Sequence, residues 1–275
     1  DFSMGLNLTG SAKVYVDRSE LKSYRFTLYH GYKVKQVTDQ TGAALDFRRE
    51  YDYVTVTRGE AAVEYLCLEY TGKSPKYYSS YAGVCLPANF AYYPIPGYRE
   101  LFKDNFYGFI DCSLPYDTAF DVRCSGRKQM YCNLAARGDN HFAGNARSIT
   151  LLSGYYDTLK LNNTLVVYPK YADTEIRARI KKNMGTFTKQ HRDIHTIFIM
   201  GADNLTPYEH LRSYDGYVVT NSMIDMEQSY FESQIDIRKM DFYKTFVYYY
   251  NEKVDREELE QLKQSEDPEE YPMVQ

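Results

Sequence analysis

Apolar and polar residues alternate with a period of two through the first 70 residues of the chain. Turn-forming residues separate four such runs, which cover residues 13–17, 24–30, 51–57 and 62–70. Alternation of this kind is typical of strands that bury one face. Because no helical pattern intervenes between these strands, we predict a mainly β fold built on an antiparallel β-sandwich.

The same alternation predicts which side chains point inward. We expect the sandwich core to contain Val14, Val16, Phe26, Leu28, Val54, Val56, Leu66 and Leu68. The stretch around residues 94–96 carries two prolines, which predicts an edge strand or a loop. Further on, residues 120–126 and 128–135 predict a hairpin, and residues 147–169 predict two or three short strands.

The pattern changes after residue 170, where a helical period replaces the alternation. Ile176, Ile180 and Met184 are spaced as the buried stripe of a helix. We expect Asp173 or Thr174 to cap its start and Gly185 to end it. Two short apolar strands follow, at residues 194–201 and 216–224, so this part predicts a small mixed α/β segment.

Three parts follow from this change of pattern. Residues 1–171 are predicted to form the β-sandwich domain, and residues 172–254 the small α/β segment. Residues 255–275 read as a charged helix followed by an acidic tail.

Composition narrows the classes of function. The formal charge of −4 and the scattered basic residues give no reason to expect binding to nucleic acid or to an anionic membrane. No run of 18 apolar residues occurs, so we predict no membrane span within this chain. The first residues lack the features of a signal peptide and an initiator Met, and we expect the chain to be a processed or excised part of a longer protein.

Tyrosine is unusually frequent, with 30 residues, whereas tryptophan is absent. Half-buried strands accommodate tyrosine well, which gives one explanation. The other is a recognition surface, because tyrosine offers a large contact area at low rotamer entropy. The clusters that suggest such a surface are Tyr77-Tyr78, Tyr81, Tyr92-Tyr93, Tyr155-Tyr156 and Tyr248-Tyr249-Tyr250.

Five cysteines leave two readings open. An odd number argues against a complete disulfide framework. Cys124 and Cys132 flank the turn of the predicted hairpin and would face each other across it, which allows a bridge. The alternative is that the cysteines are free and behave as small buried apolar residues. The sequence has no CxxC and no Cys/His cluster, so a structural zinc site is not expected.

The order of the segments resembles the N-terminal domain of the M1-family metallopeptidases, the group of aminopeptidase N and leukotriene hydrolase. The similarity rests on VEYLCLEYTGK at 63–73, CLPANFAYYPIPGY at 85–98, the strands of 106–126 and the closing strands of 148–169. Tyr92 stands where the family often has Trp. The helix and strand at 173–200 resemble the opening of the family's catalytic domain, so the resemblance implies a sandwich followed by the start of that domain.

The chemistry that this family would supply does not carry over to the residues present. None of the five histidines begins an HExxH, which a thermolysin-type zinc site needs. His191 and His195 have i,i+4 spacing, but they lie at a predicted helix-to-strand join, and Arg192 occupies the position of the general base. The region of the family's GxMEN loop, at 211–221, keeps only Asp215 as an acidic residue. We therefore predict no catalytic, cofactor-binding or metal-binding residues and no enzyme activity.

These observations favour a non-catalytic binding or scaffolding domain. M1-like domains occur fused to transporter permeases, so the resemblance suggests the extracytoplasmic, membrane-tethered part of a larger protein such as an ABC-type permease. Its partner would be another protein or the membrane-embedded part of the same polypeptide. Two alternatives remain open. The chain is either the N-terminal piece of a zinc aminopeptidase whose HExxH lies beyond it, or a stand-alone secreted protein.

Overall fold

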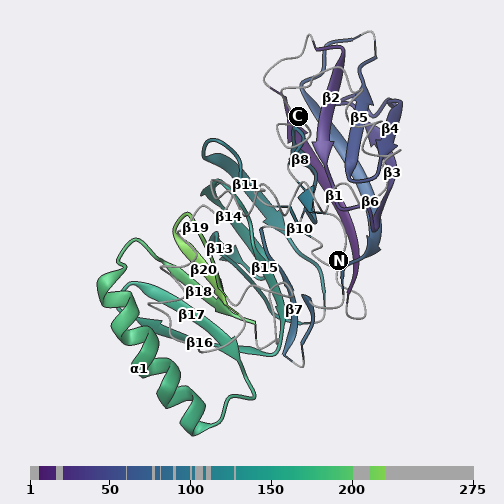
Figure 1. The fold of residues 1–275 in the computed structure, drawn as a ribbon. Helices are drawn as coiled ribbons and strands as arrows, with labels where there is room; N and C mark the ends of the chain where they lie inside the picture. Colours follow the sequence, from purple (N-terminus) through teal and green to yellow (C-terminus); the bar gives the residue numbers. More distant parts are fainter. Residues whose placement is uncertain are drawn as a thin grey trace, which may run out of the picture.

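In the computed structural model of the chain, the alternating N-terminal strands form two sheets that pack face to face (Figure 1). The structure describes residues 6–16, 21–59, 61–75, 78–80, 82–88, 91–99, 101–102, 108–109, 113–126, 128–200 and 211–220. The first sheet has the order β1 (Asn7–Tyr15), β6 (Tyr65–Lys73), β3 (Tyr32–Thr38). The second has the order β4 (Phe47–Glu50), β5 (Tyr53–Thr57), β2 (Ser23–Thr27), β8 (Ile95–Pro96).

The core of this sandwich contains the side chains that the alternation predicts. Six of the eight are buried, namely Phe26, Leu28, Val54, Val56, Leu66 and Leu68. Val14 and Val16 are half-buried and pack against the same core. The two prolines near residue 95 are accommodated as expected, because β8 is the edge strand of its sheet.

The middle of the chain adds three further groups of strands, and their pairing corrects one prediction. Their members are β12 (Met130–Cys132), β15 (Leu151–Gly154) and β7 (Gly83–Leu86) in one sheet, β11 (Thr118–Arg123), β14 (His141–Ala146) and β13 (Ala135–Gly138) in a second, and β9 (Leu101–Phe102) with β10 (Gly108–Phe109).

The predicted hairpin of 120–126 with 128–135 is wrong, because β11 pairs with β14 and β12 pairs with β15. Asn140 explains the change of partner. Its carbonyl accepts from Cys124 N, and its side-chain Oδ1 accepts from Met130 N, so neither amide is available for a ladder between the two segments.

A five-stranded mixed sheet follows, with the helix α1 (Thr174–Gln190) on one face. Its order is β16 (Tyr156–Leu161), β17 (Thr164–Pro169), β18 (Thr196–Ile199), β20 (Tyr217–Thr220), β19 (Leu211–Tyr214). The pairs of β18 with β17 and with β20 are parallel, and the two outer pairs are antiparallel. The chain is thus mainly β, with antiparallel sheets followed by a small α/β segment, as the sequence predicts.

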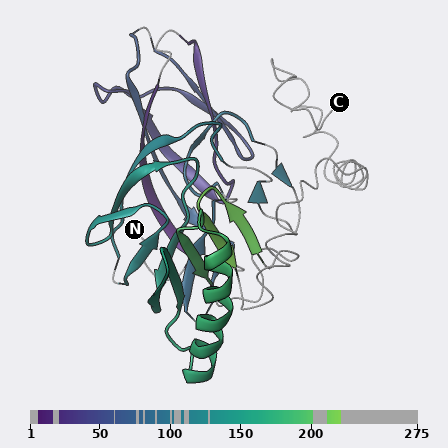
Figure 2. The same cartoon turned by 90° about the vertical axis from the view of Figure 1, so that its left-hand side faces the viewer.

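Alternate residues of this sheet face two different layers. Val166, Ile197 and Val218 pack under α1, whereas Val167 and Val219 join the core that continues into the sandwich. Figure 2 shows α1 lying across the outer side of the sheet. Because β16 and β17 share this sheet with β18 and β20, strands from both sides of residue 171 form one unit. The domain boundary proposed there stays a prediction.

Helix α1 begins as predicted and ends later than predicted. The Asp173 carboxylate accepts from Ile176 N at 2.8 Å and caps the start. The helix runs through Gly185 to Gln190, so the prediction that Gly185 ends it is wrong. Phe187 continues the buried stripe of Ile180 and Met184, and its burial outweighs the roughly 1 kcal/mol that a helical glycine costs.

Among the residues that the structure describes, no helix combines the length and the apolar character that crossing a lipid bilayer requires. The predicted charged helix from residue 255 and the acidic tail lie outside the described residues, as do the parts of the last predicted strand beyond Thr220.

Candidate functional site

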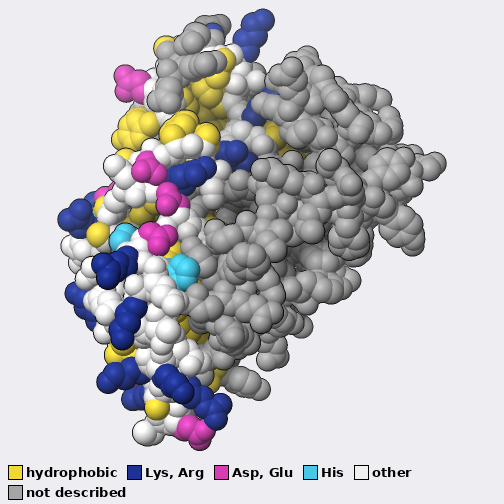
Figure 3. All heavy atoms as spheres, turned by 60° about the vertical axis from the view of Figure 1, so that its left-hand side comes forward, with side chains coloured by type: hydrophobic (Ala, Val, Ile, Leu, Met, Phe, Trp, Pro, Cys, Tyr) yellow, Lys and Arg dark blue, Asp and Glu magenta, His cyan; other side chains and the backbone are white. Residues whose placement is uncertain are grey.

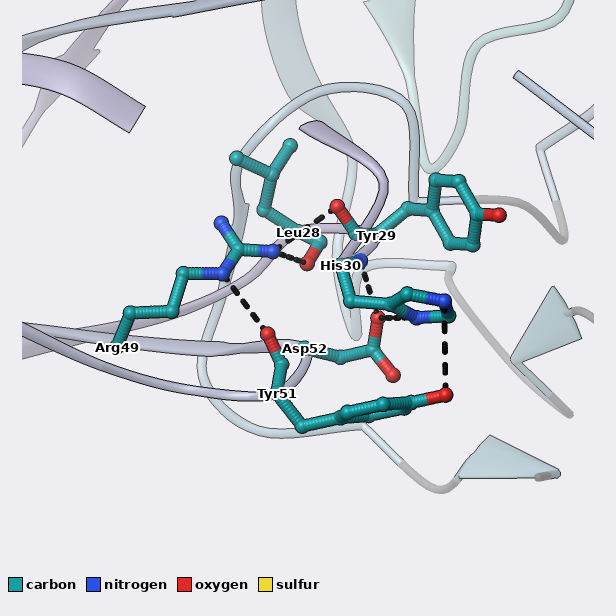
Figure 4. Close-up of polar contacts among 6 residues, drawn as sticks. All are labelled: Leu28, Tyr29, His30, Arg49, Tyr51 and Asp52. Carbon is teal, nitrogen blue, oxygen red and sulfur yellow. Dashed lines mark hydrogen bonds and ion pairs between the residues drawn. The ribbon is translucent and has the colours of Figure 1, made fainter. Parts of the chain in front are cut away.

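A polar cluster around His30 joins two loops of the sandwich (Figure 4). It forms where the loop after β2 meets the turn between β4 and β5. Asp52 is buried, and its Oδ1 accepts from the backbone N–H of His30 at 2.6 Å and lies 3.1 Å from His30 Nδ1. The imidazole is stacked on the ring of Tyr51, with centroids 4.2 Å apart.

The Arg49 guanidinium donates hydrogen bonds to three backbone carbonyls of this cluster. Its Nε donates to the Tyr51 carbonyl, and one terminal nitrogen donates to the carbonyls of Leu28 and Tyr29. The other terminal nitrogen, Nη1, is buried without a hydrogen-bond partner. Burial lowers the pKa of the guanidinium, and the nearby Asp52 charge opposes that effect. These contacts hold Tyr51 at a φ of 51°, a left-handed conformation unfavourable for a residue with a Cβ.

The geometry argues against a catalytic relay through His30. An Asp–His–Tyr relay would need the Tyr51 hydroxyl to lie in the plane of the imidazole, at hydrogen-bond distance from Nε2. Here the two rings are nearly parallel, at 24°, and the hydroxyl is 3.5 Å from Nε2. The hydroxyl therefore lies over the imidazole rather than at its edge. The cluster locks the β4–β5 turn onto the β2–β3 loop, which is a structural task.

A second polar group, the sheet joint, lies between the mixed sheet and the β12–β15–β7 sheet. We define it as Ser148, Thr150 and Tyr217, all nearly inaccessible to solvent. The Tyr217 hydroxyl is 3.0 Å from Ser148 Oγ and accepts from Thr150 Oγ1 at 3.1 Å. Thr150 Oγ1 in turn accepts from Ala88 N at 3.0 Å. Burial raises the pKa of the Tyr217 phenol well above its usual value, and the neighbouring Tyr214 adds to the effect.

Two further hydroxyls fasten the end of β18 near the joint. Tyr156 Oη donates to the Met200 carbonyl at 3.2 Å, and Ser80 Oγ donates to the same carbonyl at 3.1 Å. Met200 N donates to the Thr220 carbonyl of β20. The β18 end thus bonds both to its own sheet and to the segment that precedes β7, which ties the two layers together.

The predicted tyrosine-rich binding face is wrong for the cluster members that the structure describes. Tyr78, Tyr92 and Tyr156 are buried, Tyr93 is half-buried, and only Tyr155, 60% exposed, lies at the surface. Buried hydroxyls instead bond inside the fold, as Tyr92 Oη does to the Ile149 carbonyl. Tyr77, Tyr81 and Tyr248–Tyr250 lie outside the described residues. Tyrosine here supplies core volume with an internal hydrogen bond.

Cys67, Cys85, Cys124 and Cys132 are free thiols, and Cys112 lies outside the described residues. Cys124 and Cys132 therefore do not form the bridge that the predicted hairpin would allow, and β11 and β12 pair with other strands. Burial raises the pKa of the Cys132 thiol to about 12, so it stays protonated and unreactive at neutral pH.

His191 and His195, the two histidines with i,i+4 spacing, are held apart by the secondary structure around them. His191 caps the C-terminus of α1 and stacks on Phe187, with centroids 4.4 Å apart. The backbone N–H of His195 donates to the Gly216 carbonyl, and β18 begins at the following residue. The pair therefore does not share one helix face, as predicted from the helix-to-strand join. Within the described ranges, no three His, Cys, Asp or Glu side chains converge as a ligand set.

The region predicted to replace the GxMEN loop forms the β19–β20 hairpin. Asp215 lies exposed at its turn beside Gly216, whose φ is 77°. Tyr214 stacks on Tyr217, with ring centroids 4.6 Å apart. This hairpin therefore supports the sheet joint. Sequence reasoning missed the joint, although Ser148 and Thr150 stand two positions apart in the sequence just before β15.

No family model matches the chain, and no curated protein matches it in sequence. Solved structures do share its fold. Yeast LTA4 hydrolase with bound bestatin aligns with 78% of this chain at 9% identity and a TM-score of 0.50. A variant of the M1 zinc metallopeptidase from Deinococcus radiodurans aligns with 83% of this chain, at 11% identity and a TM-score of 0.50. A two-domain M1 zinc metallopeptidase variant bound to L-arginine also aligns with 83% of this chain, at 12% identity and a TM-score of 0.52.

These likenesses establish a fold like that of the M1 metallopeptidases and go no further than the fold. The aligned part spans 37% of the yeast enzyme and 59% of each of the other two chains. The resemblance inferred from the order of segments is thereby confirmed as a structural likeness.

Proposed function

We propose that this chain is a non-catalytic scaffold with an M1-like fold, which holds its β-sandwich and mixed sheet in one fixed arrangement. The observation that carries the proposal is the split of His191 from His195 between the end of α1 and the start of β18. Together with the absence of HExxH, it leaves the chain without the ligand set of the zinc peptidases.

The sheet joint supports the scaffold part of the proposal. A buried hydroxyl network is stable only when every member keeps its partners, so it fixes one arrangement of the two layers. The continuous apolar core from Leu66 and Leu68 through Leu152 to Val219 has the same consequence. A fixed arrangement suits a domain that presents surfaces to a partner.

The setting is a further part of the proposal. We place the scaffold outside the cytoplasm, tethered to a membrane as part of a larger protein such as an ABC-type permease. The support for this setting is that the chain resembles M1-like domains, and that such domains occur fused to transporter permeases. Mapping the accessibility of an epitope tag on the full-length protein in intact cells tests this setting, and a tag reached only after lysis would contradict it.

A second candidate is the N-terminal part of a zinc aminopeptidase. It is favoured by the partial coverage of the M1 neighbours, whose chains extend well beyond the aligned part. An aminopeptidase assay on the product of the full reading frame separates the two. The scaffold proposal expects no hydrolysis of aminoacyl substrates with added zinc, whereas zinc-dependent, bestatin-sensitive turnover would establish the alternative.

A further inference from the structure

Positive charge is concentrated in one part of the chain, which the whole-chain charge of −4 conceals. Residues 123–200 contain thirteen Lys and Arg against five Asp and Glu, a net charge of +8. Residues 201–275 contain seven Lys and Arg against seventeen Asp and Glu, a net charge of −10. A charge asymmetry of this size between segments indicates an electrostatic partner for at least one of them.

The fold brings part of the positive charge to the outer face of α1. We define the α1 basic face as Lys181, Lys182, Lys189 and Arg192, all exposed. Lys182 and Lys189 are seven residues apart, hence about two turns along the same side of the helix. That side is opposite to Ile180, Met184 and Phe187. In Figure 3, Lys and Arg side chains gather over the lower part of the described face, where α1 lies in Figure 2.

These four charges are not neutralised within the described part of the chain. Near the start of the helix, Arg177 pairs with Asp157 and Arg179 pairs with Glu175. The second half of the helix has no acidic residue, and none of the four residues of the basic face forms an ion pair with another described residue. Asp193 is the one carboxylate adjacent to them in sequence.

The rest of the outer face decides what kind of partner fits. Between the lysines it presents Gly185 and Thr186, and it carries no large apolar side chain. A stable protein interface draws most of its affinity from a few buried anchors, chiefly Trp, Tyr and Arg, and of these the face offers only Arg192. A lipid surface needs none, because Lys and Arg near anionic headgroups contribute additively and without a groove.

We propose that the α1 basic face binds anionic lipid headgroups and so orients the domain on a membrane surface. This inference goes beyond the scaffold proposal and does not depend on it. Each lysine close to the membrane surface raises the affinity about fivefold, so neutralising three of them should lower the affinity about 100-fold. The attraction acts over about a Debye length, so it should weaken sharply with salt.

The test is co-flotation of the chain with vesicles of phosphatidylcholine alone or with about 30% phosphatidylglycerol, a composition rich enough in charge for attraction of this kind. The variant K181Q/K182Q/K189Q removes three charges from the face. The matched control K33Q/K35Q/K73Q removes three exposed lysines from the β1–β6–β3 sheet. We expect binding only to the anionic vesicles, a loss of about 100-fold in the first variant and a change of less than about threefold in the control.

Four outcomes would overturn the proposal. Equal losses in both triple variants would mean that net charge, not this face, governs binding. Equal flotation with neutral vesicles would mean that charge is not the attraction. Failure to bind anionic vesicles, with binding to polyglutamate or to short duplex DNA instead, would assign the face to an acidic polypeptide or to nucleic acid. If deletion of residues 255–275 restored vesicle binding, the chain's own acidic segment would be the occupant.

Discussion

Replacing Tyr217 with Phe removes one hydroxyl from the centre of the sheet joint and leaves the ring in place. The hydroxyl makes two hydrogen bonds, 3.0 Å and 3.1 Å long, to side chains that are at most 2% exposed. Two net hydrogen bonds contribute about 2 kcal/mol, and the orphaned Ser148 hydroxyl adds a desolvation penalty of about 1 kcal/mol. We therefore expect the free energy of unfolding to fall by about 2–3 kcal/mol.

Urea denaturation followed by circular dichroism measures this change, with Tyr155→Phe as the matched control. Tyr155 is 60% exposed, so losing its hydroxyl should change stability by less than about 0.5 kcal/mol. Adding Ser148→Ala to Tyr217→Phe should destabilise by less than the sum of the single changes, because the Ser148 hydroxyl that Tyr217→Phe leaves without its partner is then absent. Equal midpoints for Tyr217→Phe and Tyr155→Phe would refute the buried network.

Two further predictions concern the backbone and the buried phenols. Gly185→Ala should stabilise the fold by about 0.5–1 kcal/mol, because an added Cβ meets nothing within 4 Å and alanine favours the helix. Gly72→Ala should destabilise it by at least about 2 kcal/mol, because the added Cβ would clash with the Gly31 carbonyl. Thermal melts that rank the two variants the other way would contradict both predictions. Burial raises the pKa of Tyr156 and Tyr217, so both stabilise the fold fully below about pH 10, and that contribution is lost as pH rises beyond. Absorbance at 295 nm should therefore show a class of tyrosines that ionises together with unfolding, and complete ionisation near pH 10 of a folded chain would sink the idea.

Local pattern was sufficient for the strands and for the start of the helix. Period-two alternation identified the inward side chains of β2, β5 and β6, because each of these strands buries one face. The partner of a strand was harder to predict. β11 and β12 are adjacent in sequence, yet Asn140 accepts from Cys124 N through its backbone carbonyl and from Met130 N through its side chain. The local pattern does not predict a contact with a residue ten or more positions away.

The end of α1 shows the same limit. Gly185 is a common helix stop, but tertiary burial of Phe187 decided the outcome. The candidate sites were also out of reach of local pattern. The His30 cluster joins residues about 20 positions apart, and the sheet joint links Ser148 with Tyr217 across 69 positions. Tyrosine frequency suggested a surface, whereas most of the tyrosines that the structure describes are buried or half-buried. Composition carries no information on which face a residue occupies.

We propose that this chain, with its M1-like fold, does not bind a catalytic zinc ion. The most direct test is the metal content of the chain, purified without chelator and dialysed against micromolar zinc, measured by plasma mass spectrometry. We predict far less than one zinc per chain, and no change in the variants His191→Ala and His195→Ala. About one zinc per chain, lost in either variant, would show that His191 and His195 form a zinc site.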